Sequence, residues 1–570
     1  MTEKHSASQS NPPASATGVI AHGTPVSLAR LAHISGGTIH NAAAAGAGTA
    51  GEPDAEQLLV SDISLNSGAV PEGGLFAALP GTRVHGAVYA GSSPAGAILS
   101  DAAGVALLKE AGEQRPIVEV ADIRKILGLV SAEIYAHPAD ELTIIGITGT
   151  SGKTTTSYLV ESCLTAAGFS VGTIGTTGTR INGRPLATEL TTPEAPTLQA
   201  IFRRMRSEGV THVVMEVSSH ALALGRITGT RFAVRAFSNL SQDHLDFHRT
   251  MEEYFETKAS FFNPEYAARQ AQGGHSAAVI NIDDQWGLRL AQRLAADPGD
   301  LKLSTIEVPQ LSGAQDRAAE LPAAGASTST IEVAEIHPDG RGGQSFAIRR
   351  DGESAQVEVP LPGYFNAANA AMAIRCAELV GVSGQQARAA VAAVKVPGRM
   401  EAVDSGQEFL AVVDYAHKPA ALAAILDTLR EQTSGRLGVV VGAGGDRDTA
   451  KRPIMGAEAA RRADLVIVTD DNPRSEDPAA IRAEVMRGAT AAAQELAQAP
   501  ELQEIGDRAA AIRAAVRWAE PADAIVIAGK GHETGQLIAG VKHHFDDREE
   551  LRAALAELSG SANHPEAGTR

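Results

Sequence analysis

The chain has 570 residues, of which 44% are hydrophobic and 20% charged, a composition typical of a globular protein too long for one domain. Its formal net charge of −18 excludes a general nucleic-acid binder, because phosphate backbones are held by surfaces rich in lysine and arginine. The only two cysteines, Cys163 and Cys376, allow neither a disulfide framework nor a thiolate metal site, which favours the reducing cytoplasm.

The N-terminal part contains an extension and a small domain. Residues 1–24 are rich in Ser, Ala and Pro without a continuous apolar run, so a disordered extension is predicted rather than a signal peptide or membrane anchor. Short apolar runs alternate with Gly/Pro turns from Leu58 to Val120, which predicts an α/β domain over residues 25–141. Within it, the Ala- and Gly-rich stretch from Asn41 to Gly48 is predicted to be a surface insertion.

The central part begins with a strand, a loop and a helix. Leu142–Thr148 has the apolar composition of a buried strand, and a glycine loop and a helical pattern over Lys153–Ala167 follow it. Because this alternation continues, a doubly wound, P-loop-type ATPase domain is predicted over residues 142–397. The small-residue-rich segment Gln310–Thr330 is predicted to be a surface insertion. Further strands are predicted at His212–Glu216, Arg235–Asn239 and Ala278–Asn281.

A second α/β run fills residues 398–556, and a tail is predicted at residues 557–570. The pattern predicts a Rossmann-like domain, so the predicted fold class is α/β with three domains. Most of its strand candidates end in loops rich in glycine or charged residues, which is where ligands bind in open parallel sheets. These strands are predicted at Phe409–Asp414, Leu437–Val441, Asp464–Thr469 and Ala524–Ala528.

The loop Gly149-Thr-Ser-Gly-Lys-Thr154 predicts a nucleotide site. Its glycines let the backbone aim N–H groups at phosphate oxygens, while Lys153 supplies a cation and Thr154 a hydroxyl for Mg²⁺. The loop departs from the strict phosphate-loop pattern, because Ile147 stands where that pattern requires glycine. Glu216, at the end of a predicted strand, is a candidate magnesium ligand, with a solvated acid as the alternative interpretation.

A series of further motifs, spanning roughly residues 55–555, resembles the Mur ligase family in order and content. The closest resemblance is to the members of that family that add the third residue of the peptidoglycan stem peptide. The motifs are Thr148-Gly-Thr-Ser-Gly-Lys-Thr-Thr155, Thr191-Thr-Pro193, Met215-Glu-Val-Ser-Ser-His220, Asn239-Leu-Ser-Gln-Asp-His-Leu-Asp246, Leu361-Pro-Gly-Tyr-Phe-Asn366 with Asn369, Asp414-Tyr-Ala-His417 and Asp471-Asn-Pro-Arg474.

The resemblance implies an ATP-dependent acid–amino-acid ligase of peptidoglycan synthesis, acting as a monomer with ATP and Mg²⁺ as cofactors. In such ligases ATP phosphorylates a carboxylate to an acyl phosphate, and the incoming amine then expels phosphate. The implied acid is the D-glutamyl carboxylate of UDP-N-acetylmuramoyl-L-alanyl-D-glutamate. The expected partners are therefore small molecules, with neither nucleic acid nor membrane insertion.

The resemblance also implies roles for individual positions. The implied catalytic residues are Lys153, Glu216, His244 and a carbamylated Lys258, and the implied metal ligands are Thr154, Glu216, His244 and Lys258. Without the resemblance, an exposed helical lysine is the simpler interpretation of Lys258, and a structural histidine that of His417. The implied ATP site comprises Gly149, Thr150, Ser151, Gly152, Lys153, Thr154, Thr155, Asn366, Asn369, Arg399, Asp414 and His417.

The implied site for the UDP-muramoyl dipeptide combines hydroxyls and arginines, which suit a pyrophosphate and two carboxylates. One departure from the family is Leu224, which stands two positions before Arg226 where many members have glutamine. The implied residues are Leu65, Ser67, Thr82, Arg83, Val84, Thr191, Thr192, Ser218 and Arg226.

The amine substrate is predicted from loops that follow the C-terminal strands. Meso-diaminopimelate carries a second ammonium and carboxylate, and arginine pairs bidentately with a carboxylate. L-Lysine lacks that carboxylate and would leave buried arginines unpaired, at a cost of roughly a few kcal/mol. Diaminopimelate is therefore predicted; L-lysine addition, another Mur ligase or folylpolyglutamate synthetase reaction, and a non-catalytic nucleotide sensor are the alternatives. The implied pocket residues are Arg447, Asp471, Asn472, Pro473, Arg474, Gly529 and Glu533.

Overall fold

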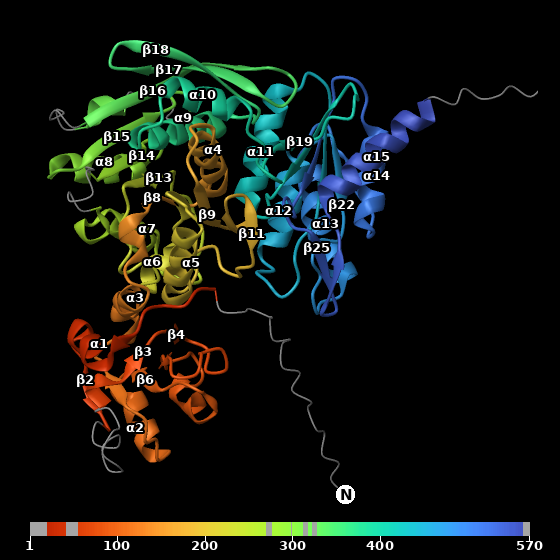
Figure 1. Cartoon of the computed structure of the whole chain (residues 1–570). Helices are drawn as coiled ribbons and strands as arrows, with labels where there is room; N and C mark the ends of the chain where they lie inside the picture. Colours follow the sequence, from red (N-terminus) through yellow and green to blue (C-terminus); the bar gives the residue numbers. More distant parts are fainter. Residues whose placement is uncertain are drawn as a thin grey trace, which may run out of the picture.

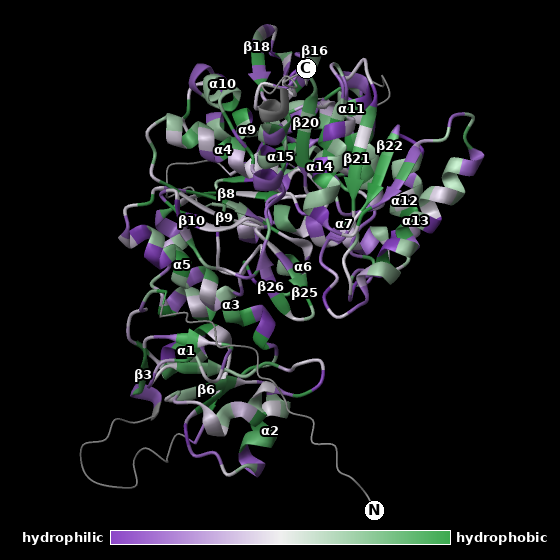
Figure 2. Cartoon of the chain, turned by 90° about the vertical axis from the view of Figure 1, so that its right-hand side faces the viewer, coloured by the Kyte–Doolittle hydropathy of each residue, from purple (hydrophilic) through white to green (hydrophobic). Residues whose placement is uncertain are grey.

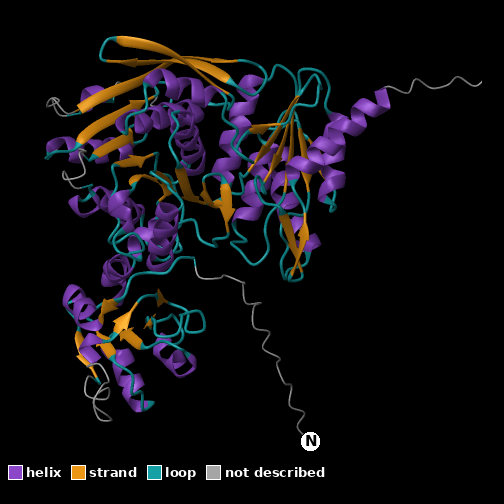
Figure 3. Ribbon diagram, viewed as in Figure 1, coloured by secondary structure: helices purple, strands orange, loops and turns teal. Residues whose placement is uncertain are grey.

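The computed structural model describes residues 20–41, 55–268, 276–297, 299–311, 317–321 and 328–562. Its three main sheets follow one another along the chain and are each flanked by helices (Figure 1). The N-terminal sheet lies at the bottom of that view, the central sheet above it, and the C-terminal sheet at the right. Figure 3 shows helices and strands alternating through all three parts, which confirms the predicted multidomain α/β class.

The N-terminal sheet has the strand order β2-β7-β6-β5-β4, with parallel pairing from β7 to β4. Its last helix, α3, packs on α5 of the central part, and a Cβ at Gly128 would come within 2.0 Å of the Thr228 carbonyl oxygen. The elements are β1 Val26–Ser27, α1 Leu28–Ser35, β2 Thr38–His40, β3 Leu59–Val60, β4 Ile63–Ser64, β5 Leu75–Ala77, β6 Ala97–Ser100, α2 Ala102–Glu110, β7 Ile117–Glu119, α3 Ile123–Ile134 and α5 Ala195–Ser207.

The predicted disordered extension, residues 1–24, needs a correction at its end. Gly23 and Thr24 donate backbone hydrogen bonds to Ser61 at 3.0 Å and Ile134 at 2.7 Å, so residues 20–24 are attached to the first sheet and its helix. Residues 1–19 lie outside the described part, as does the predicted insertion beyond Asn41.

The central sheet is parallel from β9 to β16, in the order β9-β12-β8-β13-β14-β15-β16, with antiparallel strands added at both edges. One hydrophobic core lies between it and α4, α9 and α10, and a second between it and α5, α7 and α8. The remaining elements are β8 Thr143–Thr148, α4 Lys153–Ala166, β9 Val171–Gly175, β10 Gly178–Ile181, β11 Arg184–Leu186, β12 His212–Glu216, α6 Ser219–Ala223, β13 Val234–Phe237, α7 Met251–Ala259, β14 Ala277–Asn281, α8 Gln285–Ala296, β15 Lys302–Glu307, β16 Thr328–Pro338, β17 Gln344–Arg350, β18 Glu353–Val359, α9 Tyr364–Leu379 and α10 Gly384–Ala392.

This sheet confirms the predicted doubly wound arrangement, because helices cover both faces and the chain leaves the central strand β8 in opposite directions. The predicted insertion Gln310–Thr330 is wrong at its end, since β16 begins at Thr328 and pairs with β15. The hairpins formed by β16, β17 and β18 were not predicted. Residues 312–316 and 322–327 of the insertion lie outside the described part.

The C-terminal sheet has the order β19-β20-β24-β21-β22-β23, parallel from β20 onward. Figure 2 shows its strongly hydrophobic strands β20, β21 and β22 enclosed by helices. The elements are β19 Glu401–Ala402, β20 Leu410–Asp414, α11 Pro419–Gln432, β21 Leu437–Val441, α12 Lys451–Ala460, β22 Leu465–Val468, α13 Pro478–Glu495, β23 Glu501–Glu504, α14 Arg508–Trp518, β24 Ala524–Ala528, β25 Gly535–Ile538, β26 Val541–His544 and α15 Asp547–Ala562.

The last helix corrects the predicted tail at residues 557–570, because α15 continues to Ala562. The helix is attached by a fully buried ion pair in which Arg508 Nε donates to Asp547 Oδ1 at 2.7 Å. Among the described helices, none is both long and apolar enough to span a bilayer.

Candidate functional site

The phosphate loop lies between β8 and α4, at the strand where the central sheet reverses its winding direction. Such switch points are the usual ligand sites of open α/β sheets. Gly149 and Gly152 have φ of 144° and 85°, and an added Cβ would come within 2.0 Å of Ser238 Oγ or 2.6 Å of Asn369 Oδ1. No side chain of the described residues caps α4, so its first N–H groups are available to bind an anion.

Two lysines meet at one carbonyl of this loop. Lys153 Nζ and Lys258 Nζ each donate to the Gly149 oxygen at 2.9 Å, and Lys153 also donates to Thr150 at 3.0 Å. Burial lowers the pKa of Lys153, and burial together with the nearby Lys153 charge lowers that of Lys258 well below its ordinary value. Lys258 is only 1% exposed, so its interpretation as an exposed helical lysine is wrong.

Glu216 and Thr154 form an oxygen-rich pair beside the loop. Thr154 Oγ1 donates to Glu216 Oε1 at 2.9 Å, and both side chains are buried. Thr176 adds its backbone N–H to Oε1 and its hydroxyl to Oε2, each at 2.9 Å. A carboxylate and a hydroxyl are hard ligands of the kind that Mg²⁺ prefers, so this donor set fits magnesium. The alternative of a solvated acid at Glu216 is wrong, because the side chain is 1% exposed.

His244, the third predicted metal ligand, lies in a loop with φ of 52° and a side chain 42% exposed. Its ring centre is 4.9 Å from that of His220 and 6.3 Å from that of Tyr254. Burial lowers the pKa of His244 to about 4, so its imidazole is neutral at pH 7. Within the described residues, no group of three or more His, Cys, Asp or Glu side chains is placed to hold a metal. The match between this site and magnesium therefore rests on the oxygen ligands Thr154 and Glu216.

The C-terminal part reaches this site through Arg399. Its Nη2 donates to Thr154 Oγ1 at 3.4 Å, and its guanidinium lies 4.6 Å from the centre of the Tyr415 ring. Its Nε is buried and has no hydrogen-bond partner among the described residues. An unpaired guanidinium N–H beside a phosphate loop suits an anionic ligand.

The other predicted ATP residues bind the protein itself. Asp414 accepts from the N–H groups of Met400 and Ala416 at 2.7 Å each, which fastens the turn that follows Gly398. His417 lies with Nδ1 2.8 Å from the Tyr415 carbonyl, and burial lowers its pKa to about 4. Behind the phosphate loop, Asn369 bonds Asn366 at 3.2 Å and Thr156 at 3.3 Å.

The predicted dipeptide residues of the central part form one cluster. Thr192 Oγ1 donates to the Glu216 carbonyl at 2.8 Å, and Ser218 donates its backbone N–H to Thr192 Oγ1 at 3.1 Å. Arg226 bonds the Thr192 carbonyl at 3.2 Å, and Thr191 Oγ1 lies 3.3 Å from Thr176 Oγ1. These hydroxyls therefore lie next to Glu216 and belong to the same site.

The predicted dipeptide residues of the first part lie at one edge of its sheet. Leu65 and Ser67 follow β4, and the exposed segment Thr82–Val84 follows the neighbouring parallel strand β5. No hydrogen bond or ion pair joins these side chains to the Thr192 cluster within the described residues, so polar contacts connect only the central group.

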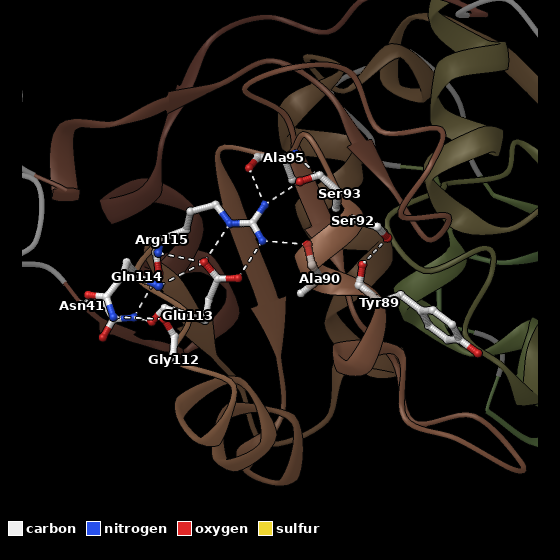
Figure 4. A network of polar contacts seen from close by, with 10 residues as sticks. All are labelled: Asn41, Tyr89, Ala90, Ser92, Ser93, Ala95, Gly112, Glu113, Gln114 and Arg115. Atoms are coloured by element: carbon white, nitrogen blue, oxygen red, sulfur yellow. Dashed lines mark hydrogen bonds and ion pairs between the residues drawn. The ribbon is translucent and has the colours of Figure 1, made fainter.

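Arg115 fixes the short helix that follows this segment. Its guanidinium donates to the carbonyls of Ala90 and Ser93 at 2.8 Å and Ala95 at 2.9 Å, and it pairs with Glu113 (Figure 4). Figure 4 shows the exposed Tyr89 pointing away from this network. Arg115 thus fastens the turn of helix and the loop that follow Thr82–Val84.

The predicted amine pocket is assembled from the loops after β21, β22 and β24. Asn472 Nδ2 donates to Glu533 Oε2 at 2.9 Å, and Arg474, with φ of 54°, donates from Nη1 to the Gly445 carbonyl at 2.6 Å. A Cβ at Gly529 would approach Asp471 Oδ2 to 2.8 Å, so this loop passes close to the carboxylate. Arg447 lies exposed on the loop after β21.

Three contacts were missed by sequence reasoning. Thr176 binds Glu216, Lys418 forms an ion pair with Asp243 across the two parts, and the buried Lys530 contacts Asn472. Only Lys530 had a signal in the sequence, because it lies between two glycines directly after a buried strand.

Comparisons with known proteins point to one family. The model of the Mur ligase middle domain matches residues 147–377, and that of the Mur ligase glutamate ligase domain matches residues 398–531.

Individual relatives match over most of their length. The chain is 56% identical over 506 residues to the UDP-N-acetylmuramoyl-L-alanyl-D-glutamate--2,6-diaminopimelate ligase of Corynebacterium glutamicum, which covers 87% of this chain and 92% of that protein. It is 46% identical to the ligase of the same name from Streptomyces coelicolor, over 88% of this chain and 93% of that one. A solved structure with this name matches with a TM-score of 0.62 at 32% identity, covering 94% of this chain and 100% of the other.

Proposed function

The chain belongs to the Mur ligase family, and from this premise we propose that it joins meso-diaminopimelate to the D-glutamyl carboxylate of UDP-N-acetylmuramoyl-L-alanyl-D-glutamate. It is an ATP-dependent, amide-bond-forming ligase of peptidoglycan synthesis. The proposed order of events is activation of the carboxylate as an acyl phosphate followed by attack of the amine.

The amine pocket is the observation that carries the choice of diaminopimelate. Glu533 and Asn472 offer an acceptor for an ammonium group, while Arg474 and Arg447 on neighbouring loops offer donors for a carboxylate. The far end of diaminopimelate is such an ammonium–carboxylate pair, and planar guanidinium groups suit its carboxylate. L-Lysine has no carboxylate there and would gain no such contact with Arg474, which is half-buried and bonded to the Gly445 carbonyl, or with the exposed Arg447.

The phosphate loop supports the activation step. The N-terminus of α4, Lys153 and Arg399 would bind the nucleotide phosphates, and Thr154 and Glu216 would hold Mg²⁺ with His244 nearby. When bound, ATP would supply the transferable phosphoryl group, and magnesium would neutralise part of its negative charge. Around them, Lys153 and Arg399 place fixed positive charge where the negative charge of the transferring group develops.

Lys258 is proposed to carry a carbamate. Its lowered pKa favours the neutral amine, whose nitrogen attacks carbon dioxide to form an N–C bond and release one proton. The product would be an anion beside the Lys153 ammonium at the Gly149 carbonyl, and its carboxylate oxygens would suit magnesium.

The three sheets are proposed to divide the substrates among them, with limits near residues 141 and 397. The first would bind the uridine diphosphate end through Leu65, Ser67 and Thr82–Val84. Thr191, Thr192, Ser218 and Arg226 would bind the peptide end near Glu216, and the C-terminal sheet the amino acid. The protein is further proposed to act as a monomer in the cytoplasm, where ATP is available.

An amine panel tests the function. Purified protein is mixed with ATP, magnesium, the UDP-muramoyl dipeptide and either meso-diaminopimelate, L-lysine or no amine, and phosphate and product mass are measured. We expect sustained phosphate release and a tripeptide product with diaminopimelate. Faster ligation of L-lysine would overturn the amine assignment, and phosphate release that ignores both co-substrates would favour a nucleotide sensor.

A further inference from the structure

Lys530 is a fully buried lysine in the loop after β24, and its side chain is 0% exposed. Its Nζ lies 3.1 Å from Asn472 Oδ1, 3.4 Å from Glu533 Oε2 and 3.7 Å from Asp471 Oδ1. A buried ammonium is tolerated only when such partners surround it. All three partners belong to the proposed amine pocket, and Lys530 lies between them.

The first consequence concerns the orientation of the Asn472 amide. Its Oδ1 accepts from Lys530 Nζ and from the Leu537 N–H at 2.9 Å, while its Nδ2 donates to Glu533 at 2.9 Å. A flipped amide would turn an N–H₂ group toward two donors and an oxygen toward a carboxylate. Lys530 therefore helps to lock Asn472 in one orientation.

The second consequence concerns Glu533. Its Oε2 accepts from both Asn472 and Lys530, and its Oε1 has no hydrogen bond within the described part of the chain. The side chain is 34% exposed, so the open oxygen can be reached from solvent. The Lys530 charge offsets part of the negative charge of Asp471 and Glu533, and the open Glu533 oxygen remains as an acceptor for an incoming ammonium.

The loop that carries Lys530 has little freedom to move. Gly529 and Gly531 have φ of 123° and 54°. A Cβ at Gly531 would come within 2.7 Å of the Gly398 carbonyl oxygen, so the loop is packed against the turn that leads into the C-terminal sheet. Backbone adjustment cannot easily replace the contacts of the Lys530 side chain.

We propose that Lys530 is the positioning residue of the amine pocket: it holds Asn472 and Glu533 in the geometry that receives the ammonium group of the incoming amino acid. The proposal rests on the ligase function stated above. Lys530 does not touch the substrate and acts through these two side chains.

Lys530→Met tests the proposal, because it keeps the length and the apolar stem and removes the charge and the donors. We expect the KM for diaminopimelate to rise about 10-fold or more, in line with the loss of hydrogen bonds to charged groups. The KM values for ATP and the UDP-muramoyl dipeptide should stay within about twofold, because their proposed residues are elsewhere. Lys542→Met is the matched control, since Lys542 is exposed on β26, and should leave all three values unchanged.

A double variant separates positioning from a general loss of structure. Because Lys530 acts in part through Glu533, Lys530→Met combined with Glu533→Gln should raise the KM for diaminopimelate by less than the product of the two single effects. Fully multiplicative effects, or equal changes in all three KM values, would overturn the proposal. Nucleotide binding, followed with a fluorescent ATP analogue, reports whether each variant is folded.

Lys530→Gln is made in parallel in case Lys530→Met does not fold, and the same selective rise in KM is expected. If neither variant binds nucleotide, the proposal is overturned, because Lys530 would then be required for folding. A wild-type protein that ligates no diamino acid would contradict the proposed function, whereas an active wild type with an unchanged Lys530→Met would contradict this inference alone.

Discussion

Two buried lysines, one in the central part and one in the C-terminal part, differ in whether carboxylates surround them. Lys258, beside the phosphate loop, shares a carbonyl acceptor with Lys153 and lies 4.8 Å from the centre of the Tyr254 ring. Among the described residues it has no carboxylate within ion-pair distance. Lys530, beside the amine pocket, is surrounded by two carboxylates and an amide oxygen.

The difference indicates what each region is built to receive. Around the phosphate loop, Lys153, Lys258, Arg399 and Lys418 place more positive charge than Glu216 and Asp243 offset, so an anion should stabilise this region. In the amine pocket the buried positive charge is already paired. Anionic phosphates suit the first region and a zwitterionic amino acid the second, and the following predictions test this contrast.

The largest expected effect is on catalysis at Lys258. Lys258→Ala should lower kcat about 10³-fold, because it removes the proposed anionic metal ligand from the phosphoryl-transfer site. Steady-state phosphate release measures the loss, and added acetate or propionate should restore part of it by occupying the cavity. A fully active Lys258→Ala would remove this role from the residue.

Arg474 should determine the choice of amine. Arg474→Met is expected to lower kcat/KM for diaminopimelate about 100-fold, since a guanidinium–carboxylate contact is lost, while the rate with L-lysine changes little. Competition between the two amines, with products separated by mass, measures the ratio. An unchanged preference would show that the pocket selects diaminopimelate by other contacts.

Stability should change in opposite directions at the two lysines. In buffer free of carbon dioxide, Lys258→Met is expected to raise the free energy of unfolding of the nucleotide-free protein by about 1–2 kcal/mol, because the wild-type lysine is buried only by losing its proton or by remaining an unpaired charge. Lys530→Met should lower it by about 2 kcal/mol, because two carboxylates lose their partner. Urea unfolding of both variants beside the wild type measures the signs; two changes of equal sign would refute the contrast.

The advantage of Lys258→Met should depend on pH. The pKa of Lys258 in the folded protein lies well below its ordinary value of 10.5, so the folded state binds fewer protons than the unfolded state in that interval. Wild-type stability therefore rises as pH increases through the interval, and the difference from Lys258→Met shrinks toward pH 10.5. Thermal melts of both proteins in buffer free of carbon dioxide measure this stability difference at each pH. A difference that does not change with pH would contradict the prediction.

The smallest expected effect concerns the ion pair that joins the two parts. Lys418 pairs with Asp243, and both are partly exposed, so Lys418→Met should weaken nucleotide binding by only about threefold. The effect should be smaller at high ionic strength. Lys395→Met, at an exposed lysine between α10 and β19, is the control and should bind nucleotide like the wild type.

Local pattern sufficed for the elements that carry the chemistry. The predicted strand and helix around the phosphate loop correspond to β8 and α4, and the predicted strands His212–Glu216 and Ala524–Ala528 coincide with β12 and β24. A buried parallel strand can be recognised in the sequence from an uninterrupted apolar run followed by glycine. The hairpins β16, β17 and β18 alternate apolar and polar residues weakly and lay partly in a segment predicted as an insertion, so they were missed.

By itself, the sequence determined the fold class, the nucleotide loop and the family resemblance, because these depend on residues close together in the chain. Only the tertiary structure decided which charges are paired. The acceptors that surround Lys258 and Lys530 come in part from segments far away in the chain, Gly149 for one and Asn472 for the other. Burial and ion pairing determine the free energy of a charged group, and neither can be predicted from the residues next to it in the chain.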